Sequence, residues 1–253
     1  MGQKLNVSRE FLQILALKAL SGQEDFGQMA FVGGTALRVL FDLRRFSEDL
    51  DFSVVQKQNY DFRGIHQRLR RAFQRFGLPF EANTKTKGSV HNMMMKFTGL
   101  PKELGLSELP HQKLSIRLEV DANPPAGWKL TDTIVHKMYM FNVIHYDLPS
   151  LYASKLHACF YRKFTKGRDI YDFIWYLGRK TVPNFKLLNN AIAQTEHKNP
   201  GISAENFKDH LLEYVQRLNF AEAKKDVERF LEDKEELKIF NAKIFTDTIE
   251  KVY

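Results

Sequence analysis

The protein has 253 residues, of which 43% are apolar and 13% aromatic, so a sizeable core can form and the disordered class is excluded. Thirty-eight Lys and Arg against thirty Asp and Glu leave a formal net charge of +8, which favours polyanionic partners such as nucleotides and nucleic acid. The single cysteine, Cys159, excludes an internal disulfide and a multi-cysteine zinc site.

Hydropathy gives no sign of a membrane segment. Residues 1–10 hold no apolar stretch of signal-peptide length, and no window approaches the roughly 20 apolar residues of a membrane span. The sparse use of cysteine fits a reducing compartment. We therefore expect a cytoplasmic protein without a membrane partner.

The first half of the chain predicts strands mixed with helices. Apolar residues recur at helical spacing after Ser8, a candidate N-cap, and predict an opening helix. Apolar or alternating runs predict strands over 29–32, 50–55, 90–97 and 113–121. A basic helix is expected over 62–76, and its Arg68, Arg70, Arg71 or Arg75 should contribute to nucleic-acid binding.

The second half predicts helices alone. We expect them over 148–162, 168–178, 185–194, 204–218 and 221–238. Strands with helices followed by helices alone predict an α/β lobe over 1–146 and an all-α lobe over 147–253, packed tightly as one bilobed unit.

Gly33 and Gly34 lie where a predicted strand gives way to a helix, with Thr35 beside them near its cap. Without side chains, the backbone there can approach a phosphate, and the helix dipole favours the phosphate's charge. Taken alone, a glycine pair at a turn more often reflects turn geometry.

Asp49 and Asp51 are two residues apart in a predicted strand, so both carboxylates project from one face. Paired carboxylates can hold Mg²⁺, which completes its shell with substrate phosphates, although an acidic strand end at the surface has the same pattern. Residues 35–45 give roughly three helical turns, or about 16 Å, enough to run back along a strand and bring the carboxylates beside the glycines.

A third carboxylate should come from the end of the strand over 113–121. Glu119 and Asp121 alternate onto one face, and either can serve as a metal ligand or as the base that deprotonates an attacking hydroxyl. The alternative is again an exposed strand end. The pattern does not separate these two residues.

Lys155 shares a helical stripe with Leu151 and Cys159. A lysine on an apolar stripe either snorkels or meets an anion, and a triphosphate is a candidate anion. Asp169 and Asp172 open the next predicted helix, where capping and the helix dipole favour a structural role.

Two segments together resemble the AbiEii/AbiGii family of nucleotidyltransferase-like toxins: Gly33-Gly34-Thr35-Ala36-Leu37 and Arg45-Phe46-Ser47-Glu48-Asp49-Leu50-Asp51-Phe52. The similarity continues through 117–120, 151–156 and Arg168-Asp169-Ile170-Tyr171-Asp172, and it spans about 31–177. It implies an α+β fold of the DNA polymerase β type, with a mixed sheet and helical additions. It also implies a toxin that is paired with an antitoxin protein.

The same resemblance implies a reaction in which a nucleotide passes from a nucleoside triphosphate (NTP) to a nucleic acid such as tRNA, with Mg²⁺. By position it assigns phosphate binding to Gly33, Gly34 and Ser47, with Thr35 in the same turn. Metal binding falls to Asp49 and Asp51, with Glu119 or Asp121 as the third carboxylate. Triphosphate binding falls to Lys155, and a catalytic or orienting role to Asp169.

Two other classes of function remain open on the residues alone. A metal-dependent nuclease also needs clustered carboxylates and a lysine, but its usual strand pattern of a carboxylate, any residue and Lys is missing here. A non-catalytic nucleic-acid-binding protein is supported by the net charge alone and leaves the glycine turn unexplained.

Overall fold

The computed structural model describes residues 2–21, 27–58, 60–162, 164 and 166–253. The chain divides into two compact units, here named the sheet unit and the helical unit. The sheet unit comprises Met1–Asp42, Phe46–Pro124 and Leu130–His145. The helical unit comprises Leu43–Arg45, Pro125–Lys129 and Tyr146–Tyr253.

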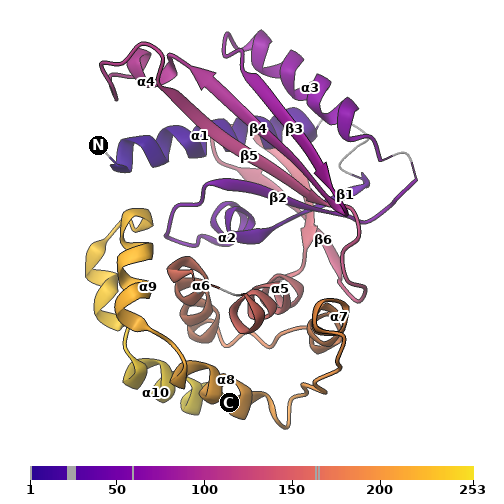
Figure 1. Ribbon diagram of the computed structural model, residues 1–253, viewed down its shortest axis with the longest axis vertical. Coiled ribbons are helices and arrows are strands. Elements are labelled where there is room, and N and C mark those ends of the chain that lie inside the picture. Colours follow the sequence, from indigo (N-terminus) through magenta and orange to yellow (C-terminus); the bar gives the residue numbers. More distant parts are fainter. Residues whose placement is uncertain (1, 22–26, 59, 163, 165) are drawn as a thin grey trace. The chain divides into compact units, whose positions relative to one another are not determined.

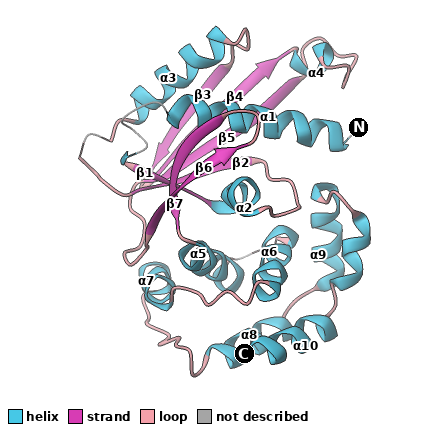
Figure 2. Ribbon diagram, turned by 180° about the vertical axis from the view of Figure 1, so that it is seen from behind, coloured by secondary structure: helices cyan, strands magenta, loops and turns pink. Residues whose placement is uncertain are grey.

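Seven strands within the described residues form one sheet in the order β3-β4-β5-β2-β1-β7-β6 (Figures 1 and 2). The sheet is mixed, because β2 is antiparallel to β1 but parallel to β5, while β4 is antiparallel to both of its neighbours. The strands are β1 Met29–Val32, β2 Asp49–Val54, β3 Glu81–Lys87, β4 Val90–Thr98, β5 Lys113–Asp121, β6 Leu130–His136 and β7 Met140–Tyr146.

One face of this sheet is apolar and packs against helices α1 (Gly2–Ser21) and α3 (Phe62–Arg75). Leu50 of β2 and Leu118 of β5 are paired in register and both fully buried. Phe73 of α3 packs on Phe97 of β4, with ring centroids 5.2 Å apart. Burial of these apolar side chains holds both helices on the sheet.

The opposite face is polar, because successive side chains of a strand point to opposite sides. It carries Asp49 and Asp51 of β2 and Arg117 and Glu119 of β5, and we call it the carboxylate face. The remaining helices of the sheet unit are α2, Gly33–Phe41, and the short α4, Leu100–Glu103.

The helical unit contains α5 Leu148–Tyr161, α6 Gly167–Gly178, α7 Phe185–Glu196, α8 Phe207–Gln216, α9 Phe220–Val227 and α10 Ala242–Val252. Aromatic side chains fill its core. Tyr152 of α5 stacks on Tyr176 of α6 with ring centroids 4.1 Å apart, and Phe173 contacts Phe245 of α10. Helices α8 and α10 lie side by side (Figure 2).

Two expectations about single elements are wrong. The first helix begins at Gly2, so Ser8 lies inside it rather than at its cap. The single helix over 221–238 is broken: α9 ends at Val227, and 3-10 helices η2 (Glu228–Phe230) and η3 (Lys234–Ile239) follow. Strands β3, β6 and β7 were not expected. Phe230 and Leu231, at the break, are both buried.

The part of the chain that the structure describes contains no helix that is both long and apolar enough to span a bilayer.

Candidate active site

The glycine turn lies directly against Asp51. β1 and β2 run antiparallel with Val32 opposite Asp51, so Gly33 at the start of α2 lies beside that aspartate. Gly33 has φ 78°, a left-handed conformation that favours glycine. A β-carbon on residue 33 would overlap the Asp51 carboxylate. The structure therefore brings the two predicted motifs together.

The chain reaches this arrangement by another route than the spacing suggested. The helix over 35–45 was expected to run back along the first strand. Instead α2 ends at Phe41, with Asp42 in the left-handed conformation, and β2 runs antiparallel to β1. The start of β2 is thereby placed at the end of β1, where Gly33 lies.

Thr35 and Ser47 hold this corner together. The Thr35 hydroxyl donates a short hydrogen bond to the carbonyl of Asp49, which ties the first turn of α2 to the start of β2. The Ser47 carbonyl accepts a hydrogen bond of 3.2 Å from the amide of Gln13 in α1. Both residues are buried. The Thr35 hydroxyl thus has a structural partner in place of a phosphate.

Asp49 forms an ion pair with Arg117, which the sequence did not single out as a site residue. The guanidinium donates from Nε and Nη2 to the two carboxylate oxygens, at 3.2 and 2.7 Å. These hydrogen bonds raise the pKa of Arg117 despite its partial burial. The parallel register of β2 and β5 sets Asp49 opposite Arg117 and so produces the pair.

The same register distinguishes Glu119 from Asp121. Glu119 lies opposite Asp51 and accepts a hydrogen bond of 3.1 Å from Asn92 of β4. Asp121 lies opposite Ser53 instead, and its carboxylate accepts from the backbone N–H of Asn123 at 2.9 Å. Burial raises the pKa of Asp121. Glu119 is therefore the carboxylate level with Asp51.

The donor types on this face fit Mg²⁺, which prefers carboxylate oxygens, and the missing β-carbon at Gly33 leaves room around Asp51. Across the described ranges, however, no three His, Cys, Asp or Glu side chains are gathered as a ready metal site. Asp49 is turned toward Arg117. The predicted ligands share a face without forming a closed cage.

The helical unit contains a buried network of charged side chains. Arg45 pairs with Asp172 through two hydrogen bonds of 2.6 Å, and these side chains are 2% and 0% exposed. Lys155 of α5 lies 2.8 Å from both Asp169 and Asp172 of α6. Arg162 also contacts Asp169. Such pairs persist in a protein interior only when well hydrogen-bonded, and this network is.

This network bears on two interpretations of the sequence. Neither Asp169 nor Asp172 caps α6, whose N-cap residue is Lys166 and makes no side-chain hydrogen bond. The anion that meets the buried Lys155 is a pair of internal aspartates. Burial would lower the pKa of Lys155, but Asp169 and Asp172 outweigh it and the pKa is raised. Burial likewise opposes the lowered pKa of Asp169, for which the nearby cations are responsible.

Over residues 15–245, the sequence matches the family described as nucleotidyl transferase AbiEii toxin, type IV TA system. The chain belongs to this family. It is therefore a nucleotidyltransferase toxin of the type IV toxin–antitoxin class, as the family resemblance of its glycine and aspartate segments implied. Membership implies a nucleotide substrate and an antitoxin partner.

Solved structures share the fold of this AbiEii-family toxin. JHP933 from Helicobacter pylori is 18% identical, with a TM-score of 0.59 over 98% of this chain and 91% of that one. A protein from the same organism that is presumed to be a nucleotidyltransferase is 19% identical, with a TM-score of 0.54 over 98% and 97%. The predicted α+β fold, with a mixed sheet and a C-terminal helical region, is confirmed. A comparison with curated proteins found no match.

Proposed function

We propose that this AbiEii-family toxin transfers a nucleotide from an NTP to an RNA acceptor, with Mg²⁺. The observation that supports this most is the contact between Gly33 and Asp51, with Glu119 level with Asp51 on the next strand. A turn that can hold phosphate and carboxylates that can hold a cation are thereby neighbours, as phosphoryl transfer needs.

Each candidate site residue of the sheet unit then has a proposed role. The backbone at Gly33 and Gly34 binds phosphate, and Ser47 supports the turn. Asp49, Asp51 and Glu119 hold Mg²⁺, for which Asp49 must release Arg117. When bound, the cation neutralises charge that develops on the transferred phosphoryl group. Asp121 is the weaker candidate, because the strand register puts it opposite Ser53 and not opposite Asp51.

In the helical unit, Lys155 and Asp169 keep the roles that family resemblance implies. Lys155 binds the triphosphate, for which it must release Asp172, and Asp169 orients the lysine through their hydrogen bond of 2.8 Å. Exchange of Lys155 for Met should weaken NTP binding. Unchanged affinity of a folded Lys155→Met protein for every NTP would remove this role.

The deciding experiment incubates the protein with each labelled NTP, Mg²⁺ and total cellular RNA, and resolves the RNA on a gel. Asp51→Asn keeps the size of the side chain but removes the charge that holds the cation. Losing such an electrostatic contribution typically costs on the order of hundreds-fold in rate. The fold should persist because Asp51 is only half-buried.

Glu119→Gln and Asp121→Asn form a matched pair in the same assay. The proposal expects Glu119→Gln to lose transfer as Asp51→Asn does, while Asp121→Asn retains most of it. Full transfer by a folded Asp51→Asn protein would refute the metal site. Shortened RNA without label would instead indicate a nuclease.

A further inference from the structure

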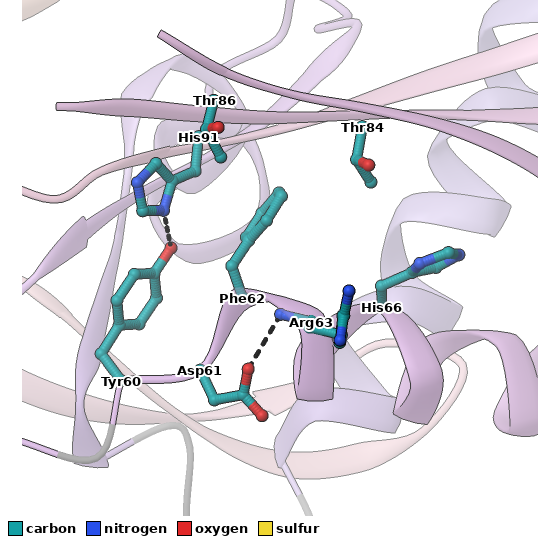
Figure 3. A pocket seen from close by; sticks show the side chains of 8 residues that line it. All are labelled: Tyr60, Asp61, Phe62, Arg63, His66, Thr84, Thr86 and His91. Atoms are coloured by element: carbon teal, nitrogen blue, oxygen red, sulfur yellow. Dashed lines mark hydrogen bonds between the residues drawn. The ribbon is translucent and has the colours of Figure 1, made fainter. Parts of the chain in front are cut away.

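A cavity of about 850 Å³ opens on the carboxylate face, beside the hairpin formed by β3 and β4. Its lining includes Asn83, Lys85, Lys87, Asn92, Met94 and Arg117. Figure 3 shows the alternate residues of the same hairpin, Thr84, Thr86 and His91, around a separate pocket at the start of α3. The hairpin thus presents its lysines on the carboxylate face and its threonines toward α3.

Strand register places this cavity in line with the candidate catalytic residues. Asp51 pairs with Glu119, Glu119 with Asn92, and Asn92 with Lys85, so the four form one row across β2, β5, β4 and β3. Adjacent strands lie about 4.8 Å apart, so the backbones of Lys85 and Asp51 lie roughly 14 Å apart across the sheet. Gly33 lies at the other end of this row. The carboxylates therefore separate the glycine turn from the cavity.

The lining has the chemistry of a nucleic-acid strand site. Lys85 and Lys87 are exposed, and their backbones are about 6.8 Å apart along an extended strand, similar to the spacing of successive phosphates in a polynucleotide. Asn83 and Asn92 offer amides for base edges, and Met94 offers an apolar surface. The volume lies within the roughly 300–1,000 Å³ typical of ligand sites.

We propose that this cavity binds the acceptor strand, as a single-stranded RNA end with its phosphates on Lys85 and Lys87 and its terminal nucleoside directed toward Glu119. The inference rests on the proposed nucleotide transfer and adds the place of the acceptor. A triphosphate at the glycine turn and an acceptor in the cavity then approach the carboxylates from opposite sides, as the transfer between them requires.

The basic helix α3 is the competing surface for RNA. Its Arg70 and Arg71 are exposed and can be reached by RNA. That the arginines of this helix contact nucleic acid stays a prediction. Yet Phe73 of α3 packs on Phe97, on the sheet face opposite the carboxylates. RNA held there would not present its end to Glu119.

Two double variants that change the net charge equally separate these surfaces. Lys85→Glu with Lys87→Glu alters the cavity, and Arg70→Glu with Arg71→Glu alters α3. Affinity for a fluorescent single-stranded oligoribonucleotide is measured by anisotropy over a range of salt concentrations. We expect at least a tenfold loss for the cavity variant and a much smaller loss for the α3 variant. Each lost phosphate contact lowers the salt slope by about 0.7, so the cavity variant should lose about 1.4.

Affinity for Mg²⁺–ATP, measured on the same proteins, identifies the ligand of the cavity. The proposal expects it to be unchanged in the cavity variant. Loss of ATP affinity with RNA affinity intact would assign the cavity to the triphosphate and overturn the proposal, as would equal RNA losses in both variants. Thermal melting confirms folding, and Lys85→Gln with Lys87→Gln serves if the Glu variant does not fold.

Asp51→Asn distinguishes failure of this inference from failure of the proposed function. It should bind the oligoribonucleotide as the unaltered protein does and transfer nothing. If the unaltered protein transfers no nucleotide but the cavity variant still loses affinity for RNA, the cavity is retained as the RNA-binding surface and the proposed transfer reaction is refuted. If the cavity variant binds RNA and transfers nucleotide as the unaltered protein does, the cavity is not the acceptor site, while the proposed transfer reaction is retained.

Discussion

The Asp51 carboxylate occupies the space that a β-carbon on Gly33 would need, since such a carbon would lie 3.0 Å from both Cβ and Cγ of Asp51. Gly33 also has a left-handed backbone, which costs an L-residue about 1–2 kcal/mol. Gly33→Ala should therefore lower the free energy of unfolding and displace Asp51. We expect nucleotide transfer to fall at least tenfold beyond any effect of stability.

Gly77 provides the matched control for this change. Its φ of 70° is close to that of Gly33, but a β-carbon there meets nothing within 4 Å. Gly77→Ala should show the backbone strain alone, with transfer activity retained. Both variants are compared in the nucleotide-transfer assay at a temperature where both are folded. Equal activity would show that the Gly33–Asp51 contact does not contribute to nucleotide transfer.

Arg45→Met should strongly destabilise the helical unit. It leaves Asp172 fully buried with Lys155 as its remaining cation among the pairs described above. Removing one partner of a buried ion pair costs about 3–5 kcal/mol. Arg217→Met is the control, because the Arg217–Glu213 pair is exposed and such pairs contribute about 0–1 kcal/mol. Urea unfolding measures both, and a loss below 1 kcal/mol for Arg45→Met would contradict the prediction.

Asp169 makes stability depend on pH in the acid range. Its pKa is lowered in the folded protein, since Lys155 and Arg162 outweigh the effect of burial. Its contribution is therefore present above the unfolded pKa of about 3.9 and is lost as the pH falls through the folded value. Urea midpoints between pH 7 and pH 3 should fall less steeply for Asp169→Asn. Parallel curves for the two proteins would count against a folded-state shift at this residue.

Cys159 should resist alkylation in the native protein. Burial raises the pKa of its thiol to about 12, and the thiol donates a hydrogen bond of 3.6 Å to the carbonyl of Asp169. The thiolate is the reactive form, and at pH 8 only about one molecule in ten thousand carries it at any moment. Iodoacetamide labelling followed by mass spectrometry should therefore be slow until urea unfolds the protein. Native labelling at the rate of a free thiol would rule out this environment.

The sequence was sufficient where the candidate site depends on local pattern. The glycine turn and the aspartates of β2 lie close together in the chain, and alternation alone puts Asp49 and Asp51 on one face. The choice of Glu119 over Asp121, and the Asp49–Arg117 pair, depend on the register between β2 and β5. Register is set by the packing of the whole sheet, so a single strand sequence does not reveal it.

Two other features could not be predicted from the sequence, for physical reasons. Edge strand β3 is polar and mostly exposed, so it lacks the apolar alternation that marks a half-buried strand. Arg45 and Asp172 are 127 residues apart, and nothing local to either one indicates the other. Because β3 could not be predicted, neither could the cavity beside the hairpin. Because the Arg45–Asp172 pair could not be predicted, neither could the buried charge network.

The segment Leu43–Arg45 belongs to the helical unit although α2 and β2, which flank it in sequence, belong to the sheet unit. A gene fragment that ends at residue 146 would encode Arg45 without Asp172, and the complementary fragment would encode Asp172 without Arg45. Recombination between relatives at that boundary would therefore separate a guanidinium from its carboxylate. The helical region can be exchanged as a cassette only if the donor also supplies a compatible residue 45.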